Sequence, residues 1–173
     1  INLMKSFKNI VFLGMMGSGK TTVGKMISKK LDIDFFDVDQ EIENKTKQSI
    51  KDIFEKKGEI FFRKLEEKLT LAILKKNQGV ISLGGGAFLN RNIQKEVLEN
   101  HLSVWLKWDD ITLIKRIKNS KKRPVVTKLN EDELKKLIKE RSKTYSKSHL
   151  KIKCDNLSKQ EIVNKIIKLN EKF

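Results

Sequence analysis

The sequence predicts an α/β protein whose mostly parallel sheet is covered by helices on both faces. Short apolar runs alternate along the chain with segments in which apolar residues recur every three or four positions. The first pattern is typical of buried strands and the second of amphipathic helices. Strands that alternate with helices favour one parallel sheet. The length of 173 residues fits a single domain over residues 1–173.

Five short segments are the candidate strands, in order along the chain. Residues 10–13 form an apolar run that stops at a glycine, residues 35–36 form a second run, and residues 80–83 form a third. Residues 104–106 form a fourth, and Ile152 and Cys154 mark the last strand. Buried strands of a parallel sheet are typically short and continuously apolar.

Helices are expected between these strands, where apolar residues recur at helical spacing. The residues that carry this spacing are Val23, Met26, Ile27 and Leu31; Ile50, Ile53 and Phe54; Leu65, Leu69, Ala72 and Ile73; Leu113, Ile114 and Ile117; and Leu134, Leu137, Ile138, Arg141 and Tyr145. Ser158 and Glu161 fit a capping box that opens a final helix with Ile162, Ile166 and Leu169.

The charge is strongly basic, with 38 Lys and Arg residues against 22 Asp and Glu residues and a formal net charge of +16. Such an excess is typical of proteins that bind nucleic acids or anionic substrates. The lysines are nevertheless spread along the chain, as at Lys51, Lys56 and Lys57 or at Lys135 and Lys136. Nucleic-acid sites usually gather on one element with arginines and stacking aromatic residues. We therefore expect solvated helix faces and no specific nucleic-acid partner.

Cysteine, histidine and apolar content exclude other classes. A single cysteine, Cys154, cannot form an internal disulfide or a cysteine-rich zinc site, and we expect it in the core. No apolar stretch approaches the roughly 20 residues of a membrane span, and residues 1–8 do not resemble a secretory signal. We expect a cytoplasmic protein without a membrane partner.

His101 and His149 have no second ligand at metal spacing, so we expect both in surface or loop positions.

A phosphate-binding loop is the most specific motif. Residues 14–21 read Gly-Met-Met-Gly-Ser-Gly-Lys-Thr and match G-x-x-x-x-G-K-[ST], between a predicted strand and a predicted helix. Glycines allow backbone N–H groups to wrap phosphates, and the helix N-terminus adds positive potential. Lys20 can reach the β- and γ-phosphates, and the Thr21 hydroxyl can hold Mg²⁺. The chain is therefore expected to bind a nucleoside triphosphate with Mg²⁺.

The motif leaves the reaction open, because many classes of enzyme use it. Motor proteins, helicases and GTPases usually carry an Asp after an apolar run, but Lys107 interrupts the nearest candidate, residues 104–109. The guanine-reading signature N-K-x-D is absent, since residues 44–47 lack its Asp. A small-molecule phosphotransferase fits this short chain better.

Two carboxylates and an arginine are candidates for the acceptor side. Asp37 and Asp39 follow the second strand, and alternate residues of an extended segment share one side. One can serve a metal-bound water and the other a substrate hydroxyl, the alternative being that they cap a helix. Arg63 has a planar fork that suits a substrate carboxylate, the alternative being a surface pair with Glu66 or Glu67.

Glycines and further arginines complete the pattern. The glycines of residues 82–86 end a strand and permit close backbone approach to a ligand, unless they form a plain loop. Arg123 precedes Pro124 in a basic segment that is typical of an exposed loop, and such a loop can cover phosphates and supply positive charge. Arg141 is followed four residues later by Tyr145.

In their order and spacing, these motifs resemble the shikimate kinase family. The matching stretches fall within residues 9–155 and are residues 14–22, 36–39, 50–54, 58–59, 62–67 and 82–87, Arg123 with Pro124, and Arg141 with Tyr145. The resemblance implies a fold like that of nucleoside monophosphate kinases, with a five-stranded parallel sheet in a three-layer α/β/α arrangement. It also implies a substrate-binding helical segment over residues 37–66 and a lid over residues 118–130.

The resemblance further implies an activity and its residues. The activity is transfer of the γ-phosphate of ATP to the 3-hydroxyl of shikimate, a step toward chorismate and the aromatic amino acids, by a monomer with one Mg²⁺ ion. The residues implied for ATP are Gly17, Ser18, Gly19, Lys20, Thr21, Thr22, Arg116 and Arg123. Those implied for shikimate are Asp39, Phe54, Phe62, Arg63, Gly85, Gly86 and Arg141. Thr21, and Asp37 through a water, are implied for Mg²⁺; Lys20, Asp39 and Arg123 are implied as catalytic.

Three alternatives stay open on the sequence alone. The first is another small-molecule kinase of the same fold, such as a gluconate or nucleoside monophosphate kinase, although gluconate should not need paired arginines beside a triple glycine. A basic nucleic-acid-dependent ATPase should show steeply salt-dependent binding. An inactive homologue should have lost residues that this chain keeps. Residues 154–157 lack the basic or proline-containing pattern common in the family, so the adenine contacts there are not implied.

Overall fold

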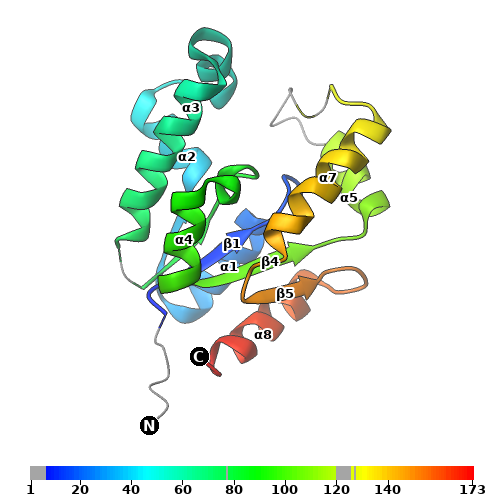
Figure 1. The fold of residues 1–173 in the computed structure, drawn as a ribbon. Helices are drawn as coiled ribbons and strands as arrows, with labels where there is room; N and C mark the ends of the chain where they lie inside the picture. The colour runs from blue at the N-terminus through cyan, green and yellow to red at the C-terminus, as the bar shows by residue number, and fades with distance from the viewer. Residues whose placement is uncertain (1–6, 77, 120–125, 127) are drawn as a thin grey trace.

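Five parallel strands form one sheet in the order β2-β3-β1-β4-β5 in the computed structural model, which describes residues 7–76, 78–119, 126 and 128–173 (Figure 1). The strands are β1 (Ile10–Leu13), β2 (Asp34–Asp37), β3 (Gly79–Ser82), β4 (Leu102–Lys107) and β5 (Leu150–Lys153). Every neighbouring pair is parallel. The five predicted strands and the parallel sheet are confirmed.

Helices cover both faces of this sheet, as the three-layer prediction requires (Figure 1). They are α1 (Lys20–Leu31), α2 (Val38–Thr46), α3 (Ile50–Leu74), α4 (Arg91–Asn100), α5 (Asp110–Lys118), α7 (Glu131–Tyr145) and α8 (Lys159–Asn170), with a short 3₁₀ helix η1 (Ala87–Leu89). The predicted capping box of Ser158 and Glu161 opens α8.

Alternating side chains of the strands divide the core into two layers. Ile10 and Phe12 of β1 pack with buried residues of α1 and α8. Val11 and Leu13 point to the other face, where α2, α3, α4, α5 and α7 contribute their apolar residues. Since successive side chains of a strand point to opposite faces, one short apolar strand serves both layers.

Two helices and the 3₁₀ turn are absent from the sequence prediction. The helix α2 buries only Val38 and Ile42, and α4 buries only Ile93 and Val97. Two apolar residues one turn apart are too few to establish a helical period among polar neighbours. Only α2 is specified more by the layer it packs on than by its own pattern, since α4 has a third apolar residue at helical spacing, Leu98, that packs against the same core.

The long helix α3 is broken at Gly58, which has φ 81° and ψ 171°. This conformation is almost exclusive to glycine. The two segments flanking the break match the two helices that the sequence predicts around residues 50–54 and 65–73. The break redirects the chain just before Glu59 and Arg63, and therefore sets where the second segment begins.

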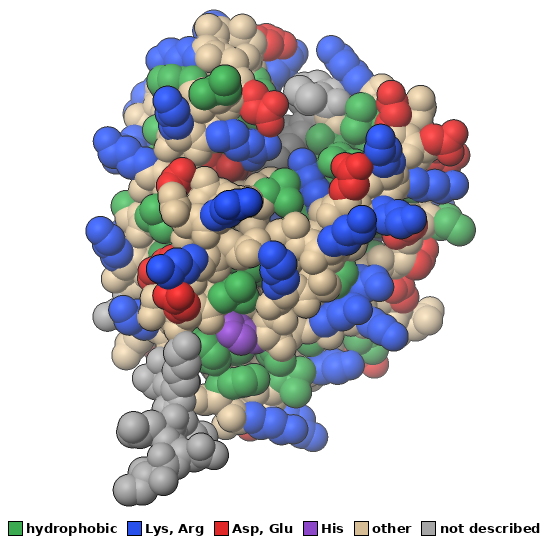
Figure 2. Space-filling view, viewed as in Figure 1, with side chains coloured by type: hydrophobic (Ala, Val, Ile, Leu, Met, Phe, Trp, Pro, Cys, Tyr) green, Lys and Arg blue, Asp and Glu red, His purple; other side chains and the backbone are tan. Residues whose placement is uncertain are grey.

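The basic residues are spread over the visible face of the molecule rather than gathered on one element (Figure 2). Lys51, Lys56 and Lys57 on α3 are exposed, as are Lys135 and Lys136 on α7. The prediction of solvated helix faces is confirmed for these residues. Among the helices of the described residues, none is both long and apolar enough to cross a membrane.

His101 lies in the bend between α4 and β4, so the predicted loop position is right, but its side chain is buried rather than on the surface; His149 is exposed. The His101 side chain has no exposed area, and its Nδ1 lies 3.1 Å from Asn9 Nδ2. Asn9 donates to the carbonyls of Leu74 and Lys76, so its nitrogen faces His101 as a donor. The ring nitrogen Nδ1 must therefore accept, which assigns the neutral tautomer protonated at Nε2.

A pH dependence of stability follows from His101. Burial lowers the pKa of His101 below its ordinary value of 6.5, and the hydrogen bond to Glu96 only partly opposes this. Because the unfolded chain then binds the proton more readily, stability should fall as pH drops through 6.5. We expect a loss of up to about 1 kcal/mol between pH 7 and pH 5.5.

Urea unfolding at the two pH values measures this loss. The His101→Gln variant should show a smaller difference between the two pH values than the unsubstituted chain. The only other histidine, His149, supplies the matched control as His149→Gln, which should keep the full difference. An unchanged difference in His101→Gln would show that the ring carries no such linkage.

Candidate active site

The phosphate-binding loop joins β1 to α1 through three glycines with left-handed backbone angles. Gly14, Gly17 and Gly19 have φ of 140°, 76° and 94°. Gly19 is the N-cap of α1 and has no side chain with which to cap it. No N-cap side chain therefore accepts from the N–H groups in the first turn of α1, and such N–H groups are suited to binding an anion.

Lys20 is buried at the start of α1, and its ammonium group lies against the loop. Its Nζ donates to the carbonyls of Gly14 at 2.7 Å and of Met15 at 2.9 Å. The side chain therefore spans the loop and holds its positive charge where the loop glycines converge. This placement is compatible with the predicted contact between Lys20 and phosphates, which stays a prediction.

Asp37 and Asp39 face one pocket, but not through the extended segment that the sequence suggests. The strand β2 ends at Asp37, and α2 begins at Val38, so Asp39 lies in a helical turn. Asp37 is the N-cap of α2, and its Oδ1 accepts from Gln40 N at 3.3 Å. The expectation of an extended Asp37–Asp39 segment is wrong because a helix cap sits directly at the strand end.

Asp37 has a second role besides the cap. Its Oδ2 accepts from Thr21 Oγ1 at 2.6 Å, which joins the end of β2 to the first turn of α1. Two hard oxygen ligands, a hydroxyl and a carboxylate, are thereby placed side by side next to Lys20. Mg²⁺ in kinases is usually held by one or two protein oxygens together with substrate phosphates, so this pair fits Mg²⁺.

A pocket of about 300 Å³ connects these residues. It is lined by the loop residues Met16 and Gly17, by Lys20, Thr21, Asp37, Asp39, Gln40, Glu43 and Ile50, and by Ser82, Leu83 and Gly85. The phosphate loop forms one wall, and the glycine segment after β3 forms another. Both carboxylates predicted from the sequence, Asp37 and Asp39, open into this space.

A second pocket lies beyond the glycine segment and holds two arginines. It is lined by Glu59, Arg63, Glu66, Gly86, Leu89, Asn90, Leu137, Glu140 and Arg141. Arg141 has a buried Nε that meets no hydrogen-bond partner within the described residues. Buried polar groups are normally satisfied, so this N–H is suited to an anionic ligand that enters the pocket.

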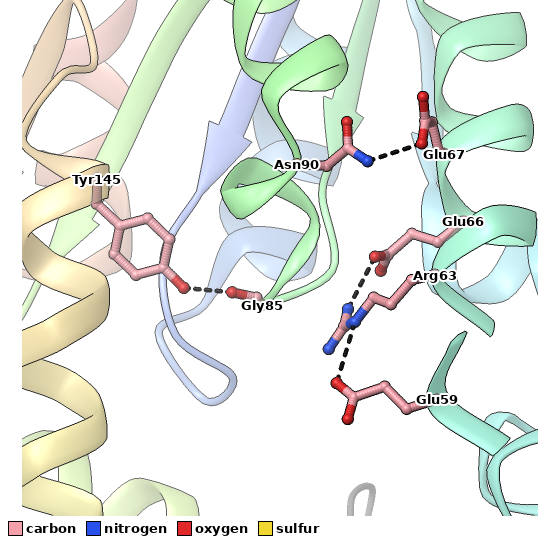
Figure 3. A network of polar contacts seen from close by, with 7 residues as sticks. All are labelled: Glu59, Arg63, Glu66, Glu67, Gly85, Asn90 and Tyr145. Carbon is pink, nitrogen blue, oxygen red and sulfur yellow. Dashed lines mark hydrogen bonds and ion pairs between the residues drawn. The ribbon is translucent and has the colours of Figure 1, made fainter. Parts of the chain in front are cut away.

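Arg63 is held in place by two glutamates (Figure 3). Its Nη1 lies 2.8 Å from Glu66 Oε1, and its Nε lies 3.5 Å from Glu59 Oε1. The side chain of Glu66 is only 2% exposed, whereas that of Glu59 is 68% exposed. Glu66 therefore fixes the guanidinium group, and the solvent-exposed pair with Glu59 contributes little.

Gly86 packs directly against the Arg63 guanidinium group. A methyl group at Gly86 would lie 2.7 Å from Nη1 and 2.9 Å from Cζ of Arg63. With Arg63 in this position, only a glycine fits at residue 86, and this accounts for the last of the three glycines in residues 84–86. Phe54 and Phe62 also pack near this group, and the Arg63 Cζ lies 6.0 Å and 5.3 Å from their ring centroids. Both phenylalanines, which the resemblance implies for shikimate, pack beside Arg63 and are not among the residues that line either pocket.

Trp108 and Arg116 are part of the site in a way that the sequence prediction only half anticipates. The indole Nε1 of Trp108 donates to the carbonyl of Ser18 at 2.8 Å, and Arg116 Nε donates to that of Gly17 at 2.6 Å. The Arg116 guanidinium stacks on the Trp108 ring at 4.2 Å. The position of Trp108 directly after β4 brings it to the phosphate loop.

The remaining predictions on reactive residues have mixed outcomes. Cys154 is buried as predicted, and burial raises the pKa of its thiol to about 12, so it is not a nucleophile at neutral pH. No group of three His, Cys, Asp or Glu side chains able to hold a metal is present in the described residues. Arg123, predicted to contact the transferred phosphate, lies outside the described residues.

Comparison with known proteins identifies a family. A family model named shikimate kinase matches residues 16–171. The shikimate kinase of Persephonella marina is 39% identical over 160 residues, which cover 92% of this chain and 97% of that relative. The structure of shikimate kinase from Acinetobacter baumannii in complex with shikimate superposes with a TM-score of 0.89 at 30% identity, over 97% of this chain and 95% of that one. For shikimate kinase from Aquifex aeolicus, the TM-score is 0.84 at 38% identity, over 95% and 96% of the two chains.

The contact of Trp108 with the phosphate loop predicts an effect on nucleotide affinity. Trp108→Phe removes the hydrogen bond to Ser18 and weakens the stack under Arg116, so the dissociation constant for ATP should rise about threefold to tenfold. Isothermal titration with ATP and Mg²⁺ measures it. Trp105→Phe changes the other tryptophan, which is buried, and should leave ATP affinity nearly unchanged. Equal affinities in the two variants would contradict the role given to Trp108.

Proposed function

The chain belongs to the shikimate kinase family, and we propose that it transfers the γ-phosphate of ATP to the 3-hydroxyl of shikimate. One observation carries the proposal: the Gly84–Gly86 segment separates the pocket of the phosphate loop from the pocket of Arg63 and Arg141. A phosphate donor on one side and a carboxylate-bearing acceptor on the other would therefore meet at this segment.

On the donor side, we assign the phosphates of ATP to the loop amides of Gly17, Ser18 and Gly19 and to Lys20 and Thr22. Lys20 supports this assignment because its buried ammonium already lies among the loop carbonyls. We assign Arg116 to the nucleotide, and its stack on Trp108 and its bond to the Gly17 carbonyl beside the loop support this assignment. Arg123 is proposed to reach the phosphates from the lid, residues 118–130.

We assign the Mg²⁺ ion that accompanies ATP to Thr21 and, through a water, to Asp37. Their hydrogen bond of 2.6 Å supports the assignment, since it brings two hard oxygen ligands to the edge of the loop. The metal supplies neutralisation of phosphate charge during phosphoryl transfer. Asp37 is fixed for this purpose by its second role as the cap of α2.

On the acceptor side, we assign the shikimate carboxylate to Arg63 and Arg141. A planar guanidinium group matches a carboxylate with two parallel hydrogen bonds, which fixes direction as well as position. Asp39 is assigned to the ring hydroxyls, and Gly85 and Gly86 contribute backbone N–H groups. Phe54 and Phe62 are assigned to the same side of the site, since their rings pack near Arg63.

Phosphoryl transfer needs mainly an in-line arrangement and neutralised charge. The arginines hold the far end of shikimate, so that the 3-hydroxyl faces the donor pocket, and Lys20 stabilises the charge that develops on the phosphate. We assign to Asp39 a hydrogen bond from the attacking hydroxyl, and a loose transition state needs little further help from a base. Closure of the lid would exclude water and limit hydrolysis of ATP.

We further propose that the enzyme acts as a monomer in the cytoplasm, without a nucleic-acid or membrane partner. The spread of lysines over many elements supports the absence of a nucleic-acid site (Figure 2). Residues 1–173 are proposed to form one kinase domain, in which residues 37–66 bind the acceptor.

An ADP-release assay with ATP and Mg²⁺ tests the function directly. Turnover should depend on shikimate, and neither gluconate nor a nucleoside monophosphate should replace it. Chelation of Mg²⁺ with EDTA should stop turnover, and added Mg²⁺ should restore it. Activity with another acceptor and none with shikimate would keep the fold and overturn the substrate.

Two substitutions test the residue assignments. Asp39→Asn should lower kcat about 100-fold or more, and Arg63→Ala should raise the KM for shikimate about 100-fold while the KM for ATP stays constant. Matched controls are Asp34→Asn, at the other end of β2, and Arg91→Ala, at the start of α4, both exposed. If either site variant kept full activity, the role assigned to that residue would be wrong.

A further inference from the structure

We propose that the Tyr145 hydroxyl is a positioning group that turns the Gly86 amide toward the acceptor pocket. Tyr145 lies on α7 one turn after Arg141, and its side chain is almost fully buried. Its hydroxyl donates a hydrogen bond to the carbonyl oxygen of Gly85 (Figure 3). The inference rests on the proposed function, because it concerns an amide that we assign to shikimate.

The orientation follows from the geometry of one peptide group. The carbonyl of Gly85 and the N–H of Gly86 belong to the same planar trans peptide, in which the two bonds point in opposite directions. Since the carbonyl points at Tyr145, the Gly86 N–H points away from it. Figure 3 shows Arg63 on the side of Gly85 opposite Tyr145, and Gly86 lines the pocket that holds Arg63 and Arg141.

Few contacts besides the hydrogen bond from Tyr145 fix the orientation of the peptide between Gly85 and Gly86. Glycines flank it on both sides, so it can rotate without the steric cost that side chains impose. Neighbouring groups are committed to the turn, since Ala87 N donates to Gly84 O and Leu89 N donates to Gly86 O. Within the described residues, the Gly86 N–H has no acceptor. The bond from Tyr145 therefore selects one orientation of a peptide that could adopt two.

The tyrosine itself is fixed by its surroundings. Its ring packs against Trp105 with the ring centroids 5.9 Å apart, and its hydroxyl oxygen lies 3.9 Å from Met15 Sδ. The same sulfur lies 3.8 Å from Arg141 Nη1. One helix, α7, thus positions both a guanidinium group and, through Tyr145, a backbone donor of the same pocket.

Tyr145→Phe keeps the ring and removes only the hydrogen bond. If the peptide is then free to rotate, the KM for shikimate should rise about fivefold to tenfold while the KM for ATP stays constant. Replacement of Tyr145 by 4-aminophenylalanine, which restores an N–H donor at the same place, should recover most of the affinity. Unchanged KM for shikimate in Tyr145→Phe would overturn the proposal.

A control separates positioning from general loss of stability. Ser103 is buried in β4, and its Oγ accepts a hydrogen bond from His149 N at 2.8 Å. Ser103→Ala removes a buried hydrogen bond near the start of β4, away from the pockets. Both variants should unfold at lower temperature, but only Tyr145→Phe should change the KM for shikimate when assayed well below either transition. An equal change in both would show a merely structural role.

The amide resonance of Gly86 gives a measurement that does not depend on catalysis. In ¹⁵N–¹H spectra of the ligand-free protein, this resonance should shift or broaden in Tyr145→Phe and stay in place in Ser103→Ala. A resonance that does not move in Tyr145→Phe would overturn the proposal whatever the activity. If the unsubstituted enzyme lacked shikimate-dependent turnover while the resonance moved as expected, the proposed function alone would fail.

Discussion

The parallel register of the sheet is the constraint on which the site depends. Phe12 of β1 and Asp37 of β2 both align with Ser82 of β3, so the three strands end at one edge. The segments that leave that edge are the phosphate loop, the Asp37 cap and the triple glycine. Because all strands run in the same direction, residues far apart in sequence reach one place without any long excursion of the chain.

Close backbone contact is the second requirement, and it explains why glycine appears where it does. At Gly86 the requirement is space, since the Arg63 guanidinium occupies the position of a side chain. At Gly58 nothing lies within 4 Å of the place that a methyl group would take, and the requirement there is the backbone angle alone. The charge on Arg63 is balanced by buried Glu66, because an unpaired buried carboxylate would be costly. The Arg63 guanidinium is thus held by Glu66 in the ligand-free structure.

The sequence predicts these features to different degrees, for physical reasons. Strands, the phosphate loop and Arg63 are visible because their signals are local, in a run, a motif or a helical spacing. The buried environment of His101 is not visible in the sequence, since its partner Asn9 is 92 residues away and nothing near His101 marks it as buried. Trp108 is similar, because its bond to Ser18 crosses 90 residues. Such contacts come from the packing of layers, which a single sequence does not display.

Met15 links the donor and acceptor halves of the site. Its carbonyl accepts from Lys20 Nζ, and its sulfur lies beside Arg141 and Tyr145. A ligand that breaks the hydrogen bond between Lys20 and the Met15 carbonyl would therefore affect Met15, which contacts Arg141 and Tyr145 of α7. Coupling between two binding sites is reciprocal, so a ligand held by Arg141 would act on the loop to the same extent. Contacts of a thioether are soft and weak, and the coupling through Met15 should therefore be small beside the direct contacts of either substrate.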